Sequence, residues 1–285
     1  MQDVLKIAIQ KSGRLNEKSM ELMKECGIKI NNGGKLKSTA SNFPLEIFYL
    51  RDDDIPQYVA EGVADIGLVG ENEYLEKQQP VEIVNRTGFS KCRLSLAIKR
   101  EEEYTGLSWF SGKKIATSYP VILKKFLEKN DIKATIEEIS GSVEIAPSIG
   151  LADAVFDIVS TGSTLLANGL KEVEVALRSE ALLIANTMLS SDKKEILQKL
   201  LFRIEAAKSA KQNKYILLNA PNQKLDQIIE LLPGMKSPTV LPLATAGWSS
   251  VHSVIKEDDF WDVIDQLKEK GAEGILVCPI EKMIV

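Results

Sequence analysis

Short apolar runs alternate with amphipathic stretches along the first two thirds of the chain. An apolar run of four to eight residues between turn signals is typical of a buried strand, and apolar residues every three or four positions are typical of a helix. The predicted strands cover residues 4–9, 45–50, 66–69, 93–98, 114–116, 135–139 and 154–159, and the predicted helices cover about 17–25, 55–61 and 121–129. This alternation predicts an α/β fold with buried strands, in two successive lobes.

Three further local features are predicted in this part of the chain. Asn16 is expected to cap the first helix and Gly27 to end it, because asparagine accepts backbone hydrogen bonds and glycine adopts positive φ. The segment GSVEIAP, residues 141–147, is expected to open another helical stretch. Residues 173–184 alternate between polar and apolar side chains and are expected to be a strand.

The last third of the chain has a different order of elements. Residues 193–210 carry apolar side chains with a period near 3.6 and predict a long helix. After it, strands are expected at 215–219, 251–255 and 274–277, with helices at 223–232 and 258–270, and the proline-rich segment LPGMKSPTVLPLA, residues 232–244, is expected to form a turn and a strand. The order β-α-β-β-α-β is that of a ferredoxin-like sandwich. A small domain added after a long helix suggests regulation or oligomerisation.

Composition excludes several classes of protein. The chain is 44% hydrophobic and 27% charged, with a net charge of −4, which argues against nucleic-acid binding through overall positive charge. Cys26, Cys92 and Cys278 are far apart and show no metal or disulfide spacing, so we expect reduced thiols in a cytoplasmic protein. No signal peptide and no apolar run of membrane-spanning length is seen. His252 is the single histidine, which leaves little room for histidine-based acid–base catalysis.

The most informative segment is DIVSTGST, residues 157–164. It follows a predicted strand and precedes a helix-compatible stretch, so backbone N–H groups and hydroxyls converge on one spot, as in a phosphate site. Gly162 permits positive φ, and Asp157 is placed to meet ribose hydroxyls or a metal. The hydroxyls are those of Ser160, Thr161, Ser163 and Thr164. An ordinary strand-to-helix loop with a hydroxyl-rich cap is the alternative.

Other polar segments follow the remaining strands. Lys11 and Arg14 flank Gly13 after the first strand and suit a polyphosphate, although a solvated loop has the same composition. Arg51 and Glu71 follow two further strands. Arg51 could reach an anion, although the acids after it could simply cap the next helix, and Glu71 could be an ordinary acid at a helix start. The candidates in the second lobe are Arg93, Ser118, Tyr119 and Glu144. Together they predict a ligand site in the cleft between two lobes.

The ordered set QKSGRL, RDDDIP, ADIGLVGEN, CRLSLA, KIATSYP, DIVSTGSTL, LLPGMKSPTVLPL and ILVCPIEKM resembles the ATP phosphoribosyltransferase family in its long form. The resemblance implies a two-lobed fold like a type II periplasmic binding protein, with lobe I from residues 1–92 and 178–210 and lobe II from 93–177. It implies a histidine-binding regulatory domain at 211–285. It further implies transfer of the phosphoribosyl group of 5-phosphoribosyl 1-diphosphate to N1 of ATP, with Mg²⁺, in dimers and hexamers inhibited by L-histidine.

Site residues are carried over on the matching motifs. The loop 157–165, which ends at Leu165, corresponds to the family's phosphoribosyl diphosphate loop, and Lys11 and Arg14 correspond to its basic loop near nucleotide and diphosphate. Cleft-lining positions are matched by Arg51, Glu71, Arg93, Ser118 and Tyr119. The histidine pocket is matched by Asn219, Met235, Ser237, Thr239 and Gly274. Phe156 stands where phosphoribosyltransferases usually have a second acid, and Glu144 is our candidate for that role.

Two alternatives remain open at this stage. The two-lobed pattern also serves solute-binding proteins and ligand-sensing domains, which carry no catalytic loop. A phosphoribosyltransferase that uses another base as acceptor would share the loop and the cleft. The hydroxyl-rich loop with its leading acid favours an enzyme.

Overall fold

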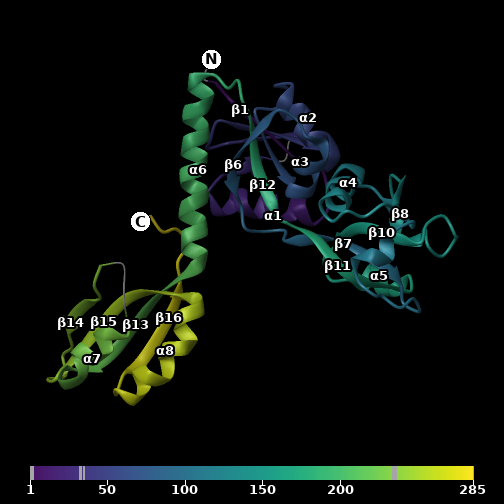
Figure 1. Cartoon of the computed structure of the whole chain (residues 1–285). Coiled ribbons are helices and arrows are strands. Elements are labelled where there is room, and N and C mark those ends of the chain that lie inside the picture. The colour runs from purple at the N-terminus through teal and green to yellow at the C-terminus, as the bar shows by residue number, and fades with distance from the viewer. Residues whose placement is uncertain (1–2, 32–33, 35, 233–235, 285) are drawn as a thin grey trace. The chain divides into compact units, whose positions relative to one another are not determined.

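The computed structural model describes residues 3–31, 34, 36–232 and 236–284. The chain forms two compact units, which Figure 1 draws together. The first contains residues 3–21 and Ile28–Ile196, and the second contains Leu22–Gly27 and residues 197–284.

Lobe I of the first unit is built on a seven-stranded sheet of order β2-β3-β4-β1-β5-β12-β6. Its central strand β1 runs parallel to β4 and β5, and β12 is antiparallel to β5. The strands are β1 (Leu5–Gln10), β2 (Ile30–Asn31), β3 (Lys37–Ala40), β4 (Leu45–Leu50), β5 (Ile66–Gly70), β6 (Val81–Arg86) and β12 (Ala181–Asn186). The helices are α1 (Arg14–Glu25), α2 (Ile55–Ala60) and α3 (Glu71–Lys77). The central strands are apolar on both faces because they are buried on both.

Lobe II is built on a five-stranded sheet of order β11-β7-β10-β8-β9. Strand β10 lies in the middle, antiparallel to β7 and parallel to β8, so its carboxyl end faces the same way as that of β8. The strands are β7 (Cys92–Lys99), β8 (Lys114–Thr117), β9 (Thr135–Glu138), β10 (Ala154–Val159) and β11 (Leu170–Ser179). The helices are α4 (Pro120–Lys129) and α5 (Ser163–Ala167). Phe110 and Phe156 are fully buried in the core of this lobe.

The chain crosses between the two sheets twice, from β6 to β7 and from β11 to β12. The expectation of one strand over residues 173–184 is therefore wrong: β11 belongs to lobe II and β12 to lobe I, with Glu180 between them. Periodicity missed the break because both strands are rich in apolar residues. The two crossings give the two-lobed α/β architecture that was predicted.

The second unit carries the long helix α6 (Ser191–Gln212), whose first turns belong to the first unit, and a four-stranded sheet of order β14-β15-β13-β16. Its strands are β13 (Asn213–Pro221), β14 (Thr239–Pro242), β15 (Trp248–Lys256) and β16 (Glu273–Pro279), and its shorter helices are α7 (Leu225–Glu230) and α8 (Glu257–Glu269). The order of elements and the central pairing of β13 with β15 and β16 confirm the ferredoxin-like prediction. Figure 1 shows α7 and α8 packed along the sheet. Among the described residues, no helix is long and apolar enough to cross a membrane.

Other local expectations need correction. Asn16 does not cap α1, because the helix already begins at Arg14, and its side-chain amide instead donates to the carbonyl of Gln10 at 2.6 Å. The segment 141–147 forms only the 3₁₀ turn Val143–Ile145. Strands β2, β3 and β6 were not predicted, since β2 and β3 are short and polar and β6 is largely exposed on one side of its sheet.

Candidate active site

A cavity of about 700 Å³ opens between lobe I and lobe II. Its walls come from the carboxyl ends of β1, β5 and β10, from the first turns of α1 and α3, and from the first crossing segment. The lining residues are Gln10, Gly13, Arg14, Leu15, Glu17, Lys18, Asp52, Gly70, Asn72, Glu73, Ser90, Lys91, Cys92, Ile158 and Ser160. Strand ends of this kind are where ligands bind in open α/β sheets.

Arg14 and Ser160 meet across this cavity. The Arg14 guanidinium donates to the Ser160 hydroxyl at 3.3 Å, although the two residues are 146 positions apart in the sequence. Gly13, at φ 90°, lets the chain turn directly from β1 into α1, which puts Arg14 at the first position of the helix. The basic loop and the hydroxyl-rich loop, which were predicted separately, therefore face one another.

The loop 157–165 has the geometry that its sequence predicts. Gly162, at φ 83°, turns the chain from β10 into α5, and the hydroxyls of Thr161 and Ser163 lie 3.0 Å apart. Ser160, Thr161, Ser163 and Thr164 are exposed, whereas the side chain of Leu165 is buried in the lobe II core. The loop thus presents exposed hydroxyl groups next to the turn at Gly162.

Asp157 is held in an environment that disfavours its charge. Its carboxylate accepts from the N–H of Ile158 at 2.7 Å, yet burial raises the pKa of Asp157 to about 6. The nearby carboxylate of Glu144 contributes to the same rise in pKa. Glu144 therefore lies within electrostatic reach of Asp157.

Arg93 contacts the backbone at the start of the hydroxyl-rich loop. Its guanidinium forms a bidentate ion pair with Glu172, with both N–O distances at 2.5 Å, and donates to the carbonyl of Ser160 at 3.1 Å. The hydrogen bonds from Arg93, the largest influence, lower the pKa of Glu172. Ser95 also donates to Glu172, at 2.7 Å. Arg93 thus fixes the start of the hydroxyl-rich loop while its own charge is neutralised.

Tyr119 joins the two lobes. Its buried hydroxyl donates to the carboxylate of Glu73 at 2.9 Å and accepts from the amide of Asn72 at 3.2 Å. Burial and the neighbouring charge of Glu73 raise the pKa of Tyr119. Ser118 instead donates to the carbonyl of Ile139 at 2.6 Å, inside lobe II. Glu73, Asn72 and Asp52 line the cavity but were not predicted as site residues.

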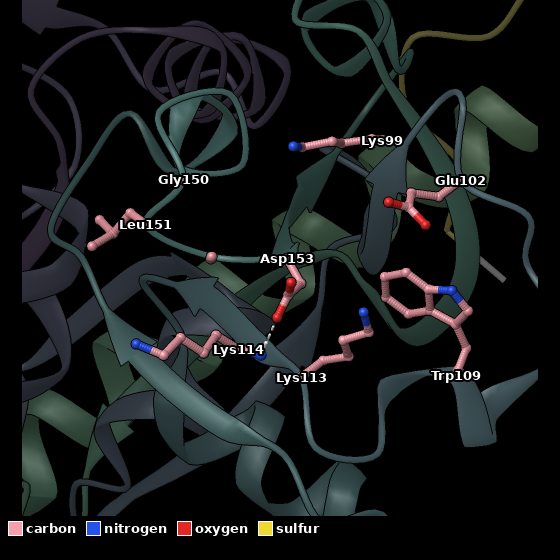
Figure 2. A pocket seen from close by; sticks show the side chains of 9 residues that line it. Lys99, Glu102, Trp109, Lys113, Lys114, Gly150, Leu151 and Asp153 are labelled. Atoms are coloured by element: carbon pink, nitrogen blue, oxygen red, sulfur yellow. Dashed lines mark hydrogen bonds between the residues drawn. The ribbon is translucent and has the colours of Figure 1, made fainter.

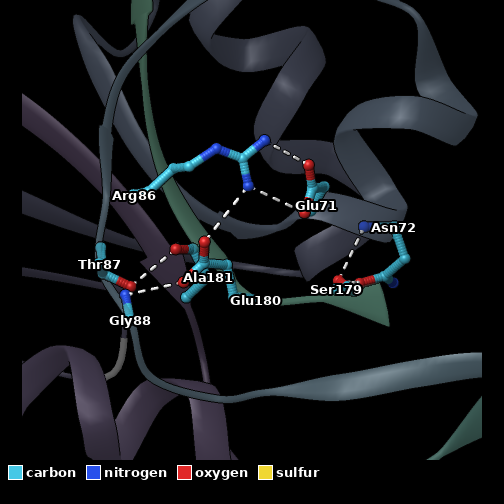
Figure 3. A network of polar contacts seen from close by, with 8 residues as sticks. All are labelled: Glu71, Asn72, Arg86, Thr87, Gly88, Ser179, Glu180 and Ala181. Carbon is cyan, nitrogen blue, oxygen red and sulfur yellow. Dashed lines mark hydrogen bonds and ion pairs between the residues drawn. The ribbon is translucent and has the colours of Figure 1, made fainter. Parts of the chain in front are cut away.

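Glu71 is engaged in an ion-pair network away from the cavity lining. Figure 3 shows its carboxylate against the guanidinium of Arg86, at distances of 2.6 and 3.2 Å, with Glu180 on the same guanidinium at 3.2 Å. Glu180 also accepts from the N–H of Gly88 at 3.0 Å. These contacts tie the two crossing segments to the start of α3. The carboxylate of Glu71 is therefore paired with Arg86 within the protein and does not line the cavity.

Lys11 and Arg51 are exposed and do not line the cavity. Lys11 follows the end of β1, and its backbone N–H donates to the carbonyl of Leu50 at 2.7 Å. Arg51 pairs with Asp53 at 3.3 Å. Both residues border the segments that form the cavity walls, with Gln10 beside Lys11 and Asp52 beside Arg51.

A smaller cavity of about 160 Å³ lies at the opposite end of the lobe II sheet. Figure 2 shows Lys99, Lys113 and Asp153 around it, with the ammonium group of Lys113 over the Trp109 ring at 4.9 Å. Asp153 immediately precedes β10, whereas Ser160 immediately follows it. This cavity is therefore separate from the site between the lobes.

No group of three or more metal-ligating side chains occurs among the described residues. A Mg²⁺ ion that arrives on a diphosphate needs only one or two protein carboxylates, because the phosphates and water complete its shell. Asp157 and Glu144, whose charges interact, are carboxylates of the kind that could serve as such ligands.

In the C-terminal domain, Asn219 and Gly274 lie together. A Cβ atom at Gly274 would lie 3.2 Å from the side-chain amide of Asn219, and Gly274 has φ 57°. Thr239 is on β14, which is separated from β13 by β15, and Ser237 is exposed just before it. Met235 lies outside the described residues.

A family model described as ATP phosphoribosyltransferase matches residues 51–206, and a model of the same family's C-terminal domain matches residues 210–282. The chain belongs to the ATP phosphoribosyltransferase family. An ATP phosphoribosyltransferase of Parabacteroides distasonis is 64% identical over 99% of this chain and 100% of its own length. The resemblance inferred from the motifs is confirmed.

Solved structures support the same assignment. The ATP phosphoribosyl transferase (HisG:HisZ) complex from Thermotoga maritima matches with a TM-score of 0.60 and 30% identity, over 71% of this chain and 99% of that chain. A substrate-binding protein of an amino acid ABC transporter matches with a TM-score of 0.50 and 12% identity, over 73% of this chain and 94% of that chain, which shows the fold alone. The predicted likeness to periplasmic binding proteins is confirmed.

As a member of the ATP phosphoribosyltransferase family, the chain is an enzyme of the first step of histidine biosynthesis. It transfers the phosphoribosyl group of 5-phosphoribosyl 1-diphosphate to N1 of ATP and releases diphosphate. Enzymes of this family use Mg²⁺. Membership settles the two alternatives, because a solute-binding module does not share the full-length identity and a different acceptor does not fit the family.

Proposed function

We propose that the cavity between the lobes is where this phosphoribosyl transfer occurs, and that the loop 157–165 holds the 5-phosphate and ribose. The hydrogen bond between Arg14 and Ser160 carries the proposal. It joins a cation at the end of one sheet to a hydroxyl-rich loop at the end of the other, inside the largest of the described cavities. Guanidinium and hydroxyl groups are the natural ligands of phosphate oxygens.

The charge of each side chain around the proposed site suggests its role in the reaction. Displacement at the anomeric carbon develops positive charge on the ribose ring, so the site must orient the reactants and stabilise charge. Asp157 would hold the ribose hydroxyls and stabilise that charge, with Glu144 as the second acid. Arg14, and Lys11 near the cavity rim, would stabilise the leaving diphosphate. Arg93 would position the loop through Ser160.

Mg²⁺ fits this arrangement as a companion of the diphosphate. Asp157 and Glu144 would supply its protein ligands, and the bound ion neutralises charge on the leaving group. In our proposal, Glu71 and Ser118 stabilise the walls of the cleft through their contacts within the protein. Arg51 adds positive charge beside the cavity, near Lys11. Tyr119 would hold the lobes together around the substrates and help to exclude water.

Regulation belongs to the C-terminal domain in this proposal. Asn219, Ser237, Thr239 and Gly274, with Met235, would bind L-histidine as the feedback inhibitor. The adjacency of Asn219 and Gly274 supports part of that pocket, because a side chain at residue 274 would crowd the Asn219 amide. We further propose a cytoplasmic homo-oligomer, of dimers and hexamers, that binds neither nucleic acid nor membranes. The relative from Thermotoga maritima was solved as a complex.

The experiment is a comparison of Arg14→Met with Lys24→Met, which removes an exposed cation from the same helix outside the cavity. Formation of phosphoribosyl-ATP is followed by absorbance, with ATP, adenine and orotate compared as acceptors. Charge-assisted hydrogen bonds contribute about 1.5–3 kcal/mol, so Arg14→Met should lower kcat/KM for phosphoribosyl diphosphate by roughly 10- to 100-fold. Lys24→Met should stay near wild type, and ATP should be the preferred acceptor. Equal losses in both variants, or none in Arg14→Met, would contradict the site.

A further inference from the structure

Glu73 is a carboxylate in the cavity wall for which the reaction described above has no role. It lies on the first turn of α3, is only 7% exposed, and lines the cavity between the lobes. Both of its protein hydrogen bonds, from Tyr119 at 2.9 Å and from Asn72 at 3.2 Å, go to Oε1. Among the described residues no donor reaches Oε2, and that atom is not sealed from solvent. The carboxylate is therefore fixed by one oxygen and open at the other.

Glu73 also lies close to the ribose end of the proposed site. Tyr119, which bonds to Glu73, is near enough to Asp157 for the charge of Asp157 to contribute to the raised pKa of Tyr119. The hydrogen bond and this electrostatic influence place Glu73, Tyr119 and Asp157 in one neighbourhood, and of the three Glu73 lines the cavity. If Asp157 holds the ribose, the base that attacks the ribose must reach the same neighbourhood.

The reaction makes a proton of the adenine acidic, and a base that accepts it as the new bond forms makes N1 a better nucleophile. The N1 lone pair of adenine forms a bond to C1 of the ribose, while the C1–O bond breaks and its electron pair leaves with diphosphate. The adenine then carries a positive charge shared between N1 and the 6-amino group, which becomes acidic. Loss of one amino proton leaves a neutral imine. Because N1 and the amino nitrogen are both bonded to C6, the departing proton lies beside the reacting bond.

We propose that Glu73 is the base that takes the proton from the 6-amino group of ATP and then passes it to water. This inference rests on the proposed function of the cavity. The hydrogen bonds from Tyr119 and Asn72 hold Oε1, which leaves Oε2 as the accepting atom. No histidine is needed, in agreement with the single histidine of the chain, which lies on β15 in the C-terminal domain.

The electrostatic surroundings suit a base near neutral pH. Burial, the largest influence, and the charges of Asp52 and Asp53 raise the pKa of Glu73, whereas Tyr119 and Lys77 lower it, and the net result is a pKa of about 7. Arg14, Lys18 and Lys91 also line the cavity. A base with a pKa close to the working pH is efficient because it is ionised and still a good proton acceptor.

The test is the pH dependence of single-turnover rates in Glu73→Gln. Glutamine keeps an acceptor oxygen for Tyr119 and Asn72 but cannot take a proton. General-base catalysis contributes about 10²- to 10⁴-fold, so the rate at pH 8 should fall at least about 100-fold, while affinities for ATP and phosphoribosyl diphosphate change by less than about threefold. The wild-type rate should rise with pH through about 7, and this rise should be absent in Glu73→Gln.

Glu76→Gln is the matched control. Glu76 is a second buried carboxylate of α3, bonded to the N–H groups of Val121 and Ile122, and does not line the cavity. Its variant should keep the rise through pH 7. A Glu73→Gln enzyme with an unchanged rate or an unchanged pH profile overturns the inference. If Arg14→Met is also fully active, the site itself is wrong; if Arg14→Met is impaired, only the base assignment fails.

Discussion

At the residue scale, our proposals depend most on two carboxylates whose charge the fold disfavours, the half-buried Asp157 and the buried Glu73. Asp157 follows from the sequence, because it heads a hydroxyl-rich loop after a buried strand. Glu73 does not, because its environment depends on Tyr119, 46 residues further on and in the other lobe. Burial and contacts between the lobes produce no recognisable pattern in the sequence around a residue such as Glu73. Sequence reasoning therefore predicted Arg14 and Asp157 as site residues and did not predict Glu73 and Asn72, which line the cavity.

Glu73→Gln should change stability in a pH-dependent way. A carboxyl whose folded pKa is about 7, above its unfolded value of 4.5, costs no stability below about pH 4.5. The cost grows between these values and is complete above pH 7, where it reaches about 3 kcal/mol. Glutamine removes the cost, so the variant should gain free energy of unfolding relative to wild type at pH 8, and gain much less at pH 5. Urea titrations at both pH values measure this, and an equal difference at both would count against it.

At the element scale, α3 connects the lobes. Its residues Asn72, Glu73 and Glu76 all contact the segment from Tyr119 to Ile122, where α4 begins. Sequence patterns identified strand 45–50 with the observed bounds, because its apolar run is buried. The same patterns missed β6, because most of its residues are not buried and it therefore lacks a clear apolar run. They merged β11 with β12, because a change from one sheet to the other does not alter the local pattern of apolar residues.

Glu76→Gln should weaken the cap that α3 places on α4. The two carboxylate oxygens accept from Val121 at 2.9 Å and Ile122 at 3.0 Å, and hydrogen bonds to a charged group contribute about 1.5–3 kcal/mol. We expect a loss of about 1–2 kcal/mol in the free energy of unfolding. Glu128→Gln, at an exposed position on α4 itself, should lose less than about 0.5 kcal/mol. Equal losses in the two variants would show that the cap does not stabilise α4.

At the scale of the whole molecule, the catalytic and C-terminal parts are separable in sequence. The solved Thermotoga maritima chain is matched over 99% of its length by only 71% of this chain. The motifs predicted the architecture of both parts, because each has a recognisable order of elements. The predicted boundaries at residues 92, 178 and 211 remain predictions.

Deletion of residues 214–285 should abolish inhibition by L-histidine, because the proposed pocket is removed with β13 to β16. Initial rates with increasing histidine measure this in the truncated and full-length enzymes, with folding checked by circular dichroism. The double variant Asn219→Ala/Thr239→Ala in the full chain should raise the inhibitory concentration at least about tenfold, by loss of hydrogen bonds to the effector. Unchanged inhibition in both proteins would place the inhibitor elsewhere.

The central claim is that the loop 157–165 holds the phosphoribosyl group, and Thr161→Val/Thr164→Val tests it most directly. Valine keeps the size of threonine but removes two exposed hydroxyls, whereas Thr135→Val on β9 alters an exposed threonine outside the loop 157–165. The measurement is the steady-state rate of phosphoribosyl-ATP formation in the three proteins, each with a wild-type thermal transition. We predict a loss of at least about 100-fold in the double variant and none in Thr135→Val. A folded double variant with the wild-type rate would contradict the assignment of this loop.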